Sequence, residues 1–275
     1  MTVVLLALAG CGAEEAADEP QRPVDRFDSA AAWKLLREQV DMGPRPAGSE
    51  TSRRLAERLR EQLPEGRFQP VPGGLRNVIG RVPGRGDRYV VVGAHYDTKD
   101  VPGFVGANDG ASGTAVAVQL ARELKPRTLR RTVVFALFDG EESPRGTPDA
   151  QFEERGLRGS KVAAPKLRDA RAMILLDFVG DRHLSIPREG YSDAGLWRRL
   201  RAAARAAGAE SAFPAAISGA VADDHLPFLE EGVPSIDLID FTFPCWHRRC
   251  DDLSAVSEHS LDQTGETVLR LLASL

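Results

Sequence analysis

The sequence predicts an α/β fold in which helices cover both faces of a central sheet. The first observation is a set of short apolar runs of strand length, rich in Val, Ile and Leu, which is typical of strands buried on both faces. The second is that helical segments separate these runs, and such alternation indicates α/β layering. The third is composition, because 42% hydrophobic and 28% charged residues are ordinary for a globular protein with a sizeable core.

The predicted elements begin with two helices, Ser29–Val40 and Ser49–Leu63, and Ser49 is the expected N-cap of the second. The Pro/Gly-rich stretch DMGPRPAG separates the two helices. The predicted strands are Asn77–Val82, Tyr89–Ala94, Thr132–Phe138, Ala172–Val179 and Val233–Asp240. The later predicted helices are Ser112–Leu124, Glu153–Ala163, Leu196–Gly208, Asp224–Glu231 and Ser260–Leu272. Without internal repeats or a further linker, residues 26–275 are predicted to form one domain.

Residues 1–25 predict a lipoprotein-type signal followed by a flexible tether. The run MTVVLLALAGC is apolar and ends in small residues before Cys11, although no Lys or Arg precedes that cysteine. It is too short to span a bilayer, and the acidic segment Gly12–Val24 has no periodicity. We expect an exported bacterial lipoprotein of the cell envelope or periplasm, held at the membrane only by lipid on Cys11. The alternative is that this segment is not a signal and is an irregular N-terminus of a cytosolic protein.

The charge balance argues against a nucleic-acid partner. The net charge is −4, whereas phosphate binding requires a strongly basic face. The Arg-rich stretch Trp197–Gly208 repeats Arg and Ala with helical spacing, and we interpret it as a solvated helix face.

The three cysteines leave two alternatives open. If Cys11 carries lipid, Cys245 and Cys250 remain as an even pair, which suits an oxidising compartment. They could close a small disulfide loop around Trp246-His247, or they could remain free thiols. Spacing alone does not show the geometry that a disulfide requires.

Side chains of the kind that bind metals follow the apolar runs, and one more acid stands at the start of a predicted helix. Ligands of α/β sheets bind outside the carboxyl ends of the strands, so residues far apart in sequence would meet at one edge. Taken singly, each has an ordinary role, such as a helix cap for Asp109 or an acidic turn for FDGEES. The set comprises His95, Asp97, Asp109, Glu141, Glu142, Asp177 and His247.

Together these residues predict a catalytic metal centre. Imidazole and carboxylate groups suit zinc, and a pair of metals bridged by a carboxylate needs about five protein ligands. The five candidate ligands are His95, Asp109, Glu142, Asp177 and His247. Glu141 remains beside a ligand and is free to act as a base.

The chain resembles the zinc aminopeptidases of the M28 family over roughly residues 30–275. The motifs that carry the resemblance are His95-x-Asp97, Gly106-Ala-Asn-Asp109, Glu141-Glu142, Asp177 and Trp246-His247. The resemblance implies a three-layer α/β/α fold of the zinc exopeptidase type, with a mixed, mostly parallel central sheet. It also implies two metal ions bridged by Asp109, one held by His95 and Asp177 and the other by Glu142 and His247.

The principal functional prediction from this resemblance is a zinc-dependent aminopeptidase. It would hydrolyse the N-terminal bond of peptides that have a free N-terminus, with metal-activated water and Glu141 as general base. Asp97 would orient His95, as metal-binding histidines usually require, and Trp246 is expected to line the substrate pocket. The preferred N-terminal residue and the number of zinc ions, one or two, stay open.

The glutaminyl-peptide cyclotransferases, which share the fold, are the first alternative. The stretches that resemble them are HYDTK, FDGEES, GLRGSK, DDHLPFLEEGVP and the Trp246-His247 dipeptide. That family has a tryptophan a few residues after the glutamate pair, whereas this chain has SPRGTPDA there. The product would be an N-terminal pyroglutamate, with release of ammonia.

The cyclotransferase alternative assigns the same residues differently. One zinc ion would be held by Asp109, Glu142 and His247. Glu141 would shuttle the proton, while Asp177 and Asp223 would support a hydrogen-bond network. A metal-free binding module on the same fold is the alternative from another class of protein. His225 in the same DDH stretch is expected to be structural, and Asp237 has no assigned role.

Overall fold

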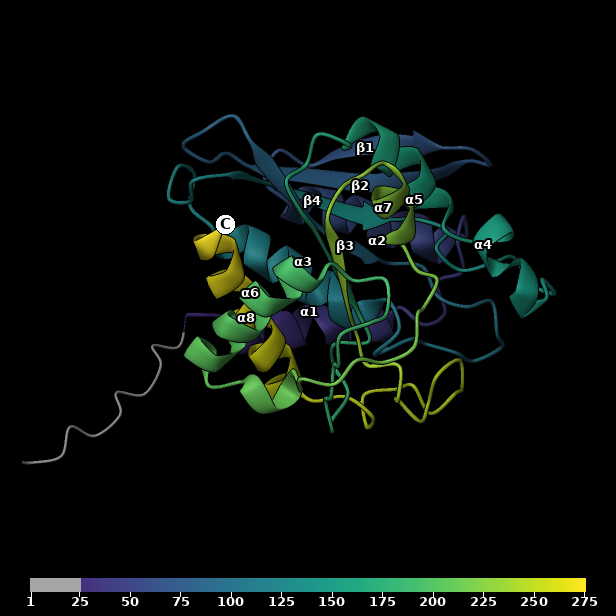
Figure 1. The fold of residues 1–275 in the computed structure, drawn as a ribbon. Helices are drawn as coiled ribbons and strands as arrows, with labels where there is room; N and C mark the ends of the chain where they lie inside the picture. The colour runs from purple at the N-terminus through teal and green to yellow at the C-terminus, as the bar shows by residue number, and fades with distance from the viewer. Residues whose placement is uncertain (1–25) are drawn as a thin grey trace, which may run out of the picture.

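The computed structural model describes residues 26–275 of the chain (Figure 1). The predicted signal and tether, with Cys11, therefore lie outside the described residues. Within residues 26–275, no helix combines the length and apolar character needed to cross a membrane.

A single six-stranded sheet, in the order β1-β2-β4-β3-β5-β6, runs through the described chain. Its strands are β1 (Arg67–Val71), β2 (Leu75–Val82), β3 (Tyr89–His95), β4 (Thr132–Phe138), β5 (Met173–Asp177) and β6 (Ser235–Ile239). Strands β4, β3, β5 and β6 are parallel, whereas β1 and β2 form an antiparallel edge. The mixed, mostly parallel sheet is thus confirmed. Strand β1 escaped prediction because its short sequence RFQPV has no continuous apolar run and contains a proline, which is unusual inside a strand.

Helices cover both faces of this sheet, as predicted (Figure 1). The first face packs against α1 (Ser29–Asp41), α2 (Glu50–Gln62), α3 (Ala111–Glu123), α6 (Ala194–Ala207) and α8 (Glu258–Ser274). The second face packs against α5 (Arg158–Ala163) and α7 (Leu226–Glu230). Because side chains alternate along a strand, Val90 and Val92 belong to the first core and Val91 to the second. The three-layer α/β/α arrangement follows from this division.

Helix starts follow local capping signals. Ser49 accepts a hydrogen bond from the backbone N–H of Ser52 and caps α2, as predicted. The side chains of Asp193 and Ser257 cap α6 and α8 in the same way. Each such cap contributes about 1 kcal/mol to helix stability.

One predicted helix, Glu153–Ala163, is wrong as a single element, because the structure contains two helices there. The helix α4 (Phe152–Arg155) ends before Gly156, and α5 begins after Leu157, whose φ is 55°. The N–H of Leu157 donates to the carbonyl of Glu141 at 2.8 Å. A Cβ at Gly156 would lie 2.6 Å from that same oxygen. The helix is interrupted because the chain packs directly against the segment that follows β4.

Candidate active site and metal centre

Adjacent parallel strands bring the predicted site residues to one edge of the sheet. Strand β3 ends at His95, strand β5 ends at Asp177, and Glu141 with Glu142 follows strand β4. Because β3 lies between β4 and β5, these three strand ends are neighbours. The convergence expected from strand polarity is therefore present.

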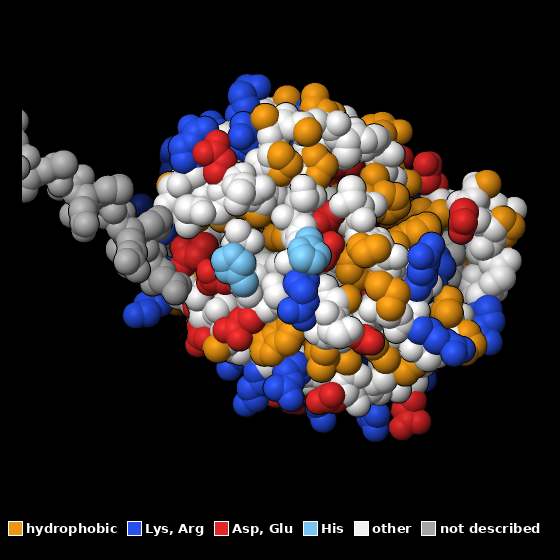
Figure 2. All heavy atoms as spheres, turned by 90° about the horizontal axis from the view of Figure 1, so that it is seen from below, with side chains coloured by type: hydrophobic (Ala, Val, Ile, Leu, Met, Phe, Trp, Pro, Cys, Tyr) orange, Lys and Arg blue, Asp and Glu red, His pale blue; other side chains and the backbone are white. Residues whose placement is uncertain are grey.

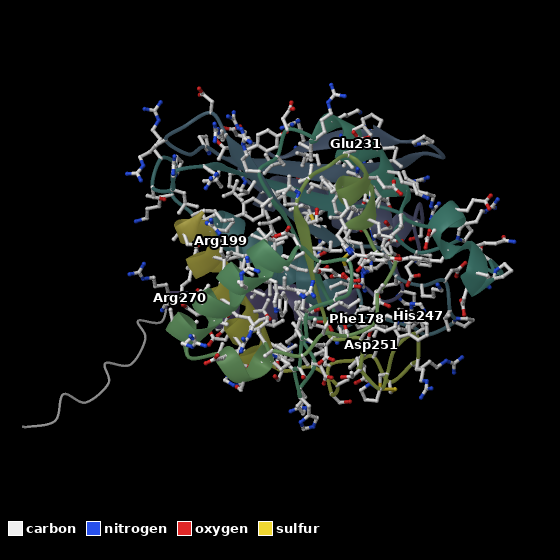
Figure 3. The ribbon with its side chains drawn as sticks, viewed as in Figure 1. Phe178, Arg199, Glu231, His247, Asp251 and Arg270 are labelled. Carbon is white, nitrogen blue, oxygen red and sulfur yellow. A yellow bond between two sulfur atoms is a disulfide. The ribbon has the colours of Figure 1, made fainter. Side chains whose placement is uncertain are left out.

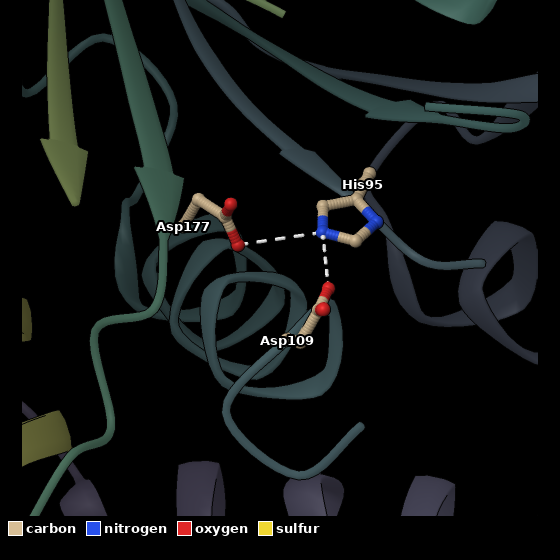
Figure 4. Close-up of side chains that lie close together, drawn as sticks. All are labelled: His95, Asp109 and Asp177. Atoms are coloured by element: carbon tan, nitrogen blue, oxygen red, sulfur yellow. Dashed lines mark hydrogen bonds and ion pairs between the residues drawn. The ribbon is translucent and has the colours of Figure 1, made fainter. Parts of the chain in front are cut away.

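The first group, which we name the strand trio, consists of His95, Asp109 and Asp177 (Figure 4). The Nε2 atom of His95 lies 3.2 Å from Asp109 Oδ1 and 3.3 Å from Asp177 Oδ1. All three side chains are buried. Two of them stand at strand ends, and Asp109 lies in the turn that precedes α3.

The second group, which we name the loop trio, consists of Asp109, Glu142 and His247. His247 belongs to the long loop after β6, and its Nε2 atom lies 3.2 Å from Glu142 Oε1 and 3.5 Å from Asp109 Oδ2. Its side chain is 22% exposed, unlike the other members. Asp109 therefore presents one carboxylate oxygen to each trio.

The two trios fit a zinc ion, or a bridged pair of ions. Within each trio the candidate ligand atoms lie within 4.8 Å of one another. Among the described residues, the buried Asp109 Oδ2 and Glu142 Oε1 accept no hydrogen bond. Buried carboxylate oxygens without a donor are costly, and a divalent cation would remove that cost. Nitrogen and oxygen ligands of these types suit zinc, and the metal-binding roles themselves remain predictions.

The strand trio gathers more negative charge than its histidine can balance. Burial by itself lowers the pKa of His95, but the carboxylates of Asp177, Asp109 and Asp97 raise that pKa well above the ordinary value. Burial also raises the pKa of Asp177 to about 7, against the lowering effect of His95. Bound protons or a bound cation would each compensate this charge.

Asp97 lies between the imidazole of His95 and the backbone of the glutamate pair. Its Oδ1 atom lies 3.6 Å from His95 Nδ1. Its two carboxylate oxygens accept the backbone N–H groups of Glu141 and Glu142, each at 3.2 Å. Gly110 is needed beside this arrangement, because its φ is 85° and a Cβ would lie 2.8 Å from the carbonyl oxygen of Asp97. The geometry accords with the positioning role predicted for Asp97.

The two adjacent glutamates have different environments. Burial and the negative charge of Glu142 raise the pKa of Glu141 well above its ordinary value. Burial also raises the pKa of Glu142, but His247 and Lys99 outweigh that effect and lower it. The Nζ atom of Lys99 lies 2.8 Å from Glu142 Oε2. Because the pKa values of the two carboxyl groups are shifted in opposite directions, Glu142 is suited to hold a cation and Glu141 to carry a proton.

A cavity of about 560 Å³ opens over these residues, a size typical of sites that bind small molecules. Glu141, Glu142 and Asp177 line its polar side. Its apolar wall includes Phe178, Ile239, Phe241, Trp246 and Phe152. The ring of Trp246 stacks on that of His247 with centroids 4.1 Å apart. On the surface seen in Figure 2, histidine, acidic and hydrophobic side chains occur on the same face.

Phe152 gives the pocket an aromatic side chain near the place where the sequence SPRGTPDA has none. It lies two residues beyond that stretch, and Lys99 Nζ is 5.9 Å from its ring centroid. The motif alone did not indicate Phe152, because a turn and a short 3-10 helix, Asp149–Gln151, separate Phe152 from the glutamate pair.

Asp223 lines the same cavity and belongs to a cluster of buried acidic side chains behind it. Burial raises the pKa of Asp223 and that of Asp237, and the negative charge of Asp223 raises the pKa of Asp237 further. His225 is fully buried, with Nε2 3.3 Å from Glu189 Oε2 and Nδ1 3.7 Å from Asp237 Oδ2. The structural role expected for His225 accords with these contacts, and Asp237 now has neighbours that its sequence context did not indicate.

Sequence reasoning missed two buried residues that shape the turn before α3. The carboxylate of Asp251 accepts the backbone N–H groups of Asn108 at 2.7 Å and Asp109 at 3.0 Å. The guanidinium of Arg45 donates to the carbonyl of Gly106 at 3.2 Å, and burial lowers its pKa to about 10. The available signals were weak: an arginine between two prolines and an aspartate after Cys250.

The open question about the cysteines is answered by a disulfide between Cys245 and Cys250, whose Cα atoms are 5.4 Å apart. It brackets Trp246 and His247. His247 and Phe178, which follows Asp177 directly, line the same cavity, and Figure 3 shows both far from Arg199 and Arg270.

Comparisons with known proteins identify the family of the chain. Residues 77–272 match the model of peptidase family M28. A glutaminyl-peptide cyclotransferase of Drosophila melanogaster is 28% identical over 235 residues, which are 74% of this chain and 66% of that protein. The aminopeptidase YwaD of Bacillus subtilis is 29% identical over 196 residues, 65% of this chain and 39% of that protein. This chain thus spans slightly under two thirds of the length of the curated cyclotransferase that it matches.

Solved structures match over a larger share of their length. The glutaminyl cyclase of an Acidobacteriales bacterium has a TM-score of 0.77 and 29% identity, covering 94% of this chain and 98% of that one. A leucine aminopeptidase precursor from Bacteroides thetaiotaomicron has a TM-score of 0.80 and 26% identity, covering 91% and 98%.

Proposed function

The chain belongs to peptidase family M28, and we propose that within this family it is a zinc-dependent glutaminyl-peptide cyclotransferase. The observation that carries the proposal is its similarity to glutaminyl cyclases, one of which matches over almost the whole of both chains. This activity was the first alternative to the aminopeptidase reading of the sequence, and the comparisons support it better. The named relatives are enzymes, so a metal-free binding module is left without support.

The loop trio is the proposed zinc site. Asp109, Glu142 and His247 place one imidazole nitrogen and two carboxylate oxygens around one point beside the cavity. The Nζ atom of Lys99 lies 2.8 Å from Glu142 Oε2, so the other oxygen, Oε1, faces His247. When bound there, zinc would polarise the side-chain carbonyl of the substrate glutamine.

Glu141 is the proposed proton carrier. The α-amine of the N-terminal glutamine attacks its own side-chain amide carbon, and a new C–N bond closes the ring. Glu141 accepts the proton that the amine loses and delivers it to the amide nitrogen. The original C–N bond then breaks and ammonia leaves. A carboxyl group buried at the base of the cavity, with a raised pKa, suits this transfer in both directions.

Asp177 and Asp223 line the cavity near Glu141 and are proposed to orient the substrate amine. Both carboxyl groups are buried, so hydrogen bonds from an amine would be shielded from water. The aromatic side chains of Phe178, Phe241 and Trp246 would enclose the glutamine carbon chain and limit the access of competing water.

Aminopeptidase activity remains a second candidate because of one observation. Asp109 presents one oxygen to each trio, which is the arrangement that a carboxylate bridging two metals requires. With both trios filled, Glu141 would take a proton from water in place of the substrate amine. The two candidate reactions therefore share the site and differ in the nucleophile.

The deciding experiment is mass spectrometry of peptides incubated with the zinc-loaded full-length protein. The peptide set would begin with glutamine or with other residues. Loss of one ammonia from the glutamine peptides alone, with chain length unchanged, is the expected result. A matched peptide with an acetylated N-terminal glutamine is the control, because its blocked amine cannot attack. Stepwise shortening of the peptides would instead establish the aminopeptidase.

We also propose that the protein is exported and that its substrates are peptides with a free N-terminus. The disulfide supports export, because disulfides persist in oxidising compartments. Lipidation at Cys11 and a location in the cell envelope remain proposals. Fractionation of expressing bacteria would test them, with a Cys11→Ser variant expected to move from the membrane to the soluble fraction.

A further inference from the structure

The segment Cys245–Asp251, which we name the histidine loop, carries His247 without help from a helix or strand. Its own backbone hydrogen bonds are local turns: Arg248 N–H donates to the Cys245 carbonyl at 2.9 Å, and Asp251 N–H to the Arg248 carbonyl at 2.9 Å. Turns of this kind open easily when nothing else restrains them. The position of His247 therefore depends on contacts with the rest of the chain. One of these is the hydrogen bond from Arg249 Nε to the Pro102 carbonyl, at 2.8 Å, and others fix the two ends of the loop.

The backbone of His247 needs such restraint. Its φ is 53°, in the left-handed region that non-glycine residues rarely adopt. A residue held there costs free energy and keeps the conformation only when its surroundings enforce it. Stacking on Trp246 and an edge contact with Phe104, at centroid distances of 4.1 and 6.3 Å, hold the ring, but both contacts require the loop to be in place.

The two ends of the histidine loop are anchored to different parts of the site. At the first end, Cys245 is half-buried and packs against the small core formed by Phe178, Ile239 and Phe243. At the second end, the buried Asp251 binds the backbone N–H groups of Asn108 and Asp109. The Cys245 end therefore packs against residues at and after the ends of β5 and β6, and the Asp251 end binds the backbone of the shared ligand Asp109.

The disulfide joins these two ends. It links Cys245 to Cys250, the residue immediately before Asp251, across a separation of five residues. The loop that carries His247 is thereby closed at its base. Cys250 is exposed, so the bond can be reached from solvent.

We propose that the Cys245–Cys250 disulfide is the positioning device for His247, so that the zinc affinity of the loop trio depends on the redox state of this pair. This inference rests on the metal site of the proposed function but not on which reaction the site performs. Reduction by a dithiol transfers two electrons and two protons to the cysteine sulfurs. The S–S bond breaks, two thiols form, and the dithiol becomes a disulfide.

The test measures zinc affinity by competition with a chromophoric chelator. It uses the full-length chain with Cys11→Ser, in which Cys245 and Cys250 are the remaining cysteines. We expect reduction to weaken zinc binding by about 10- to 100-fold, the usual effect of losing a group that orients a ligand. The variant with Cys245→Ser and Cys250→Ser should match the reduced protein and should not respond to the dithiol.

A second arm asks whether the disulfide acts through His247. In a His247→Ala background, reduction should cause no further loss of zinc affinity, because the residue being positioned is absent. The visible absorption of cobalt(II) bound in place of zinc should change on reduction in the parent chain and stay constant in the His247→Ala chain. Near-ultraviolet circular dichroism of the zinc-free forms checks that the fold survives, and a purely structural role would alter it without these site-specific differences.

Three outcomes would overturn the inference. Equal zinc affinity in the oxidised and reduced forms would overturn it while leaving the proposed metal site intact. Tighter binding after reduction would overturn it as well, because the free thiolates would then be ligands. No zinc binding in either form would overturn the proposed metal centre and the inference together.

Discussion

The strand trio and the loop trio share Asp109, yet they are held in place by different means. In the strand trio, His95 and Asp177 are the last residues of two adjacent parallel strands. Hydrogen bonding between those strands fixes their spacing. In the loop trio, His247 lies eight residues beyond β6, in a left-handed conformation and partly exposed.

This difference separates a site built on the sheet from one built on a loop. Two members of the strand trio, His95 and Asp177, end strands of the buried sheet, so their spacing can change only if the sheet changes. The loop trio depends on Asp251, the disulfide and stacking by Trp246, each of which can be altered while the sheet persists. We therefore expect variants of the supporting residues to affect the loop trio far more than the strand trio.

The largest expected effect is on kcat, in a variant of Glu141. It tests whether the two trios hold the metal while Glu141 carries the proton. Replacing Glu141 with glutamine should lower kcat by about 10³-fold, because an amide cannot carry the proton. Zinc content should stay unchanged, since Glu141 belongs to neither trio. Ammonia release and metal analysis on the same samples give both quantities, and a near-normal rate would remove Glu141 from the mechanism.

The next effect compares one histidine from each trio directly. His247→Ala should weaken zinc binding by more than about 100-fold, because losing a ligand costs more than losing a group behind a ligand. His95→Ala should leave one zinc ion bound at the loop trio. Metal analysis after dialysis measures both. Loss of one ion from two in each variant would instead indicate a bridged pair and favour the aminopeptidase.

A smaller effect is expected from a residue that binds only backbone. Asp251→Asn should weaken zinc binding by about tenfold, because its amide nitrogen would face a backbone N–H group and release Asp109. Asp252→Asn is the matched control, since its carboxylate contacts Ser254 and not the turn before α3. Isothermal titration of both variants with zinc would test this, and equal affinities would show that Asp251 does not position the ligand.

A further prediction, on a different scale from the zinc affinities, concerns pH and the zinc-free protein. Burial raises the pKa of Asp177 and of Asp251 to about 7 in each case, well above the unfolded value. A raised carboxyl pKa stabilises the fold at low pH, and that stability is lost as the pH rises toward the folded pKa. Chelator-treated protein should therefore lose on the order of a few kcal/mol of unfolding free energy between about pH 4 and pH 7.

Zinc should reverse this trend, because it binds the deprotonated ligands and stabilises the fold more strongly as pH rises. Thermal unfolding across this pH range, with and without zinc, measures the effect. A melting temperature of the zinc-free protein that rises toward pH 7 would contradict the buried-acid explanation. Unequal changes in variants of Asp177 and Asp251 would show which of the two buried carboxyl groups contributes more.

Most of the strand trio could be predicted from the sequence, because it depends on strand ends. The apolar runs that mark β3, β4 and β5 end at or just before His95, Glu141 and Asp177. Parallel strands bring such ends to one edge, so a local pattern was sufficient to group them. The antiparallel strand β1 and the break between α4 and α5 were not predictable in this way, since tertiary contacts override weak local preferences there.

The sequence by itself determined the layered α/β fold and the set of candidate ligands. It also distinguished Glu142, a candidate ligand, from Glu141, a candidate base. It did so because strand periodicity and strand polarity are local properties of the chain. Only the tertiary structure decided that Cys245 and Cys250 are bonded, that Asp251 holds Asp109, and that Phe152 lines the pocket. These contacts join segments whose distance in space depends on how loops fold over the sheet, and no local pattern in the sequence specifies that distance.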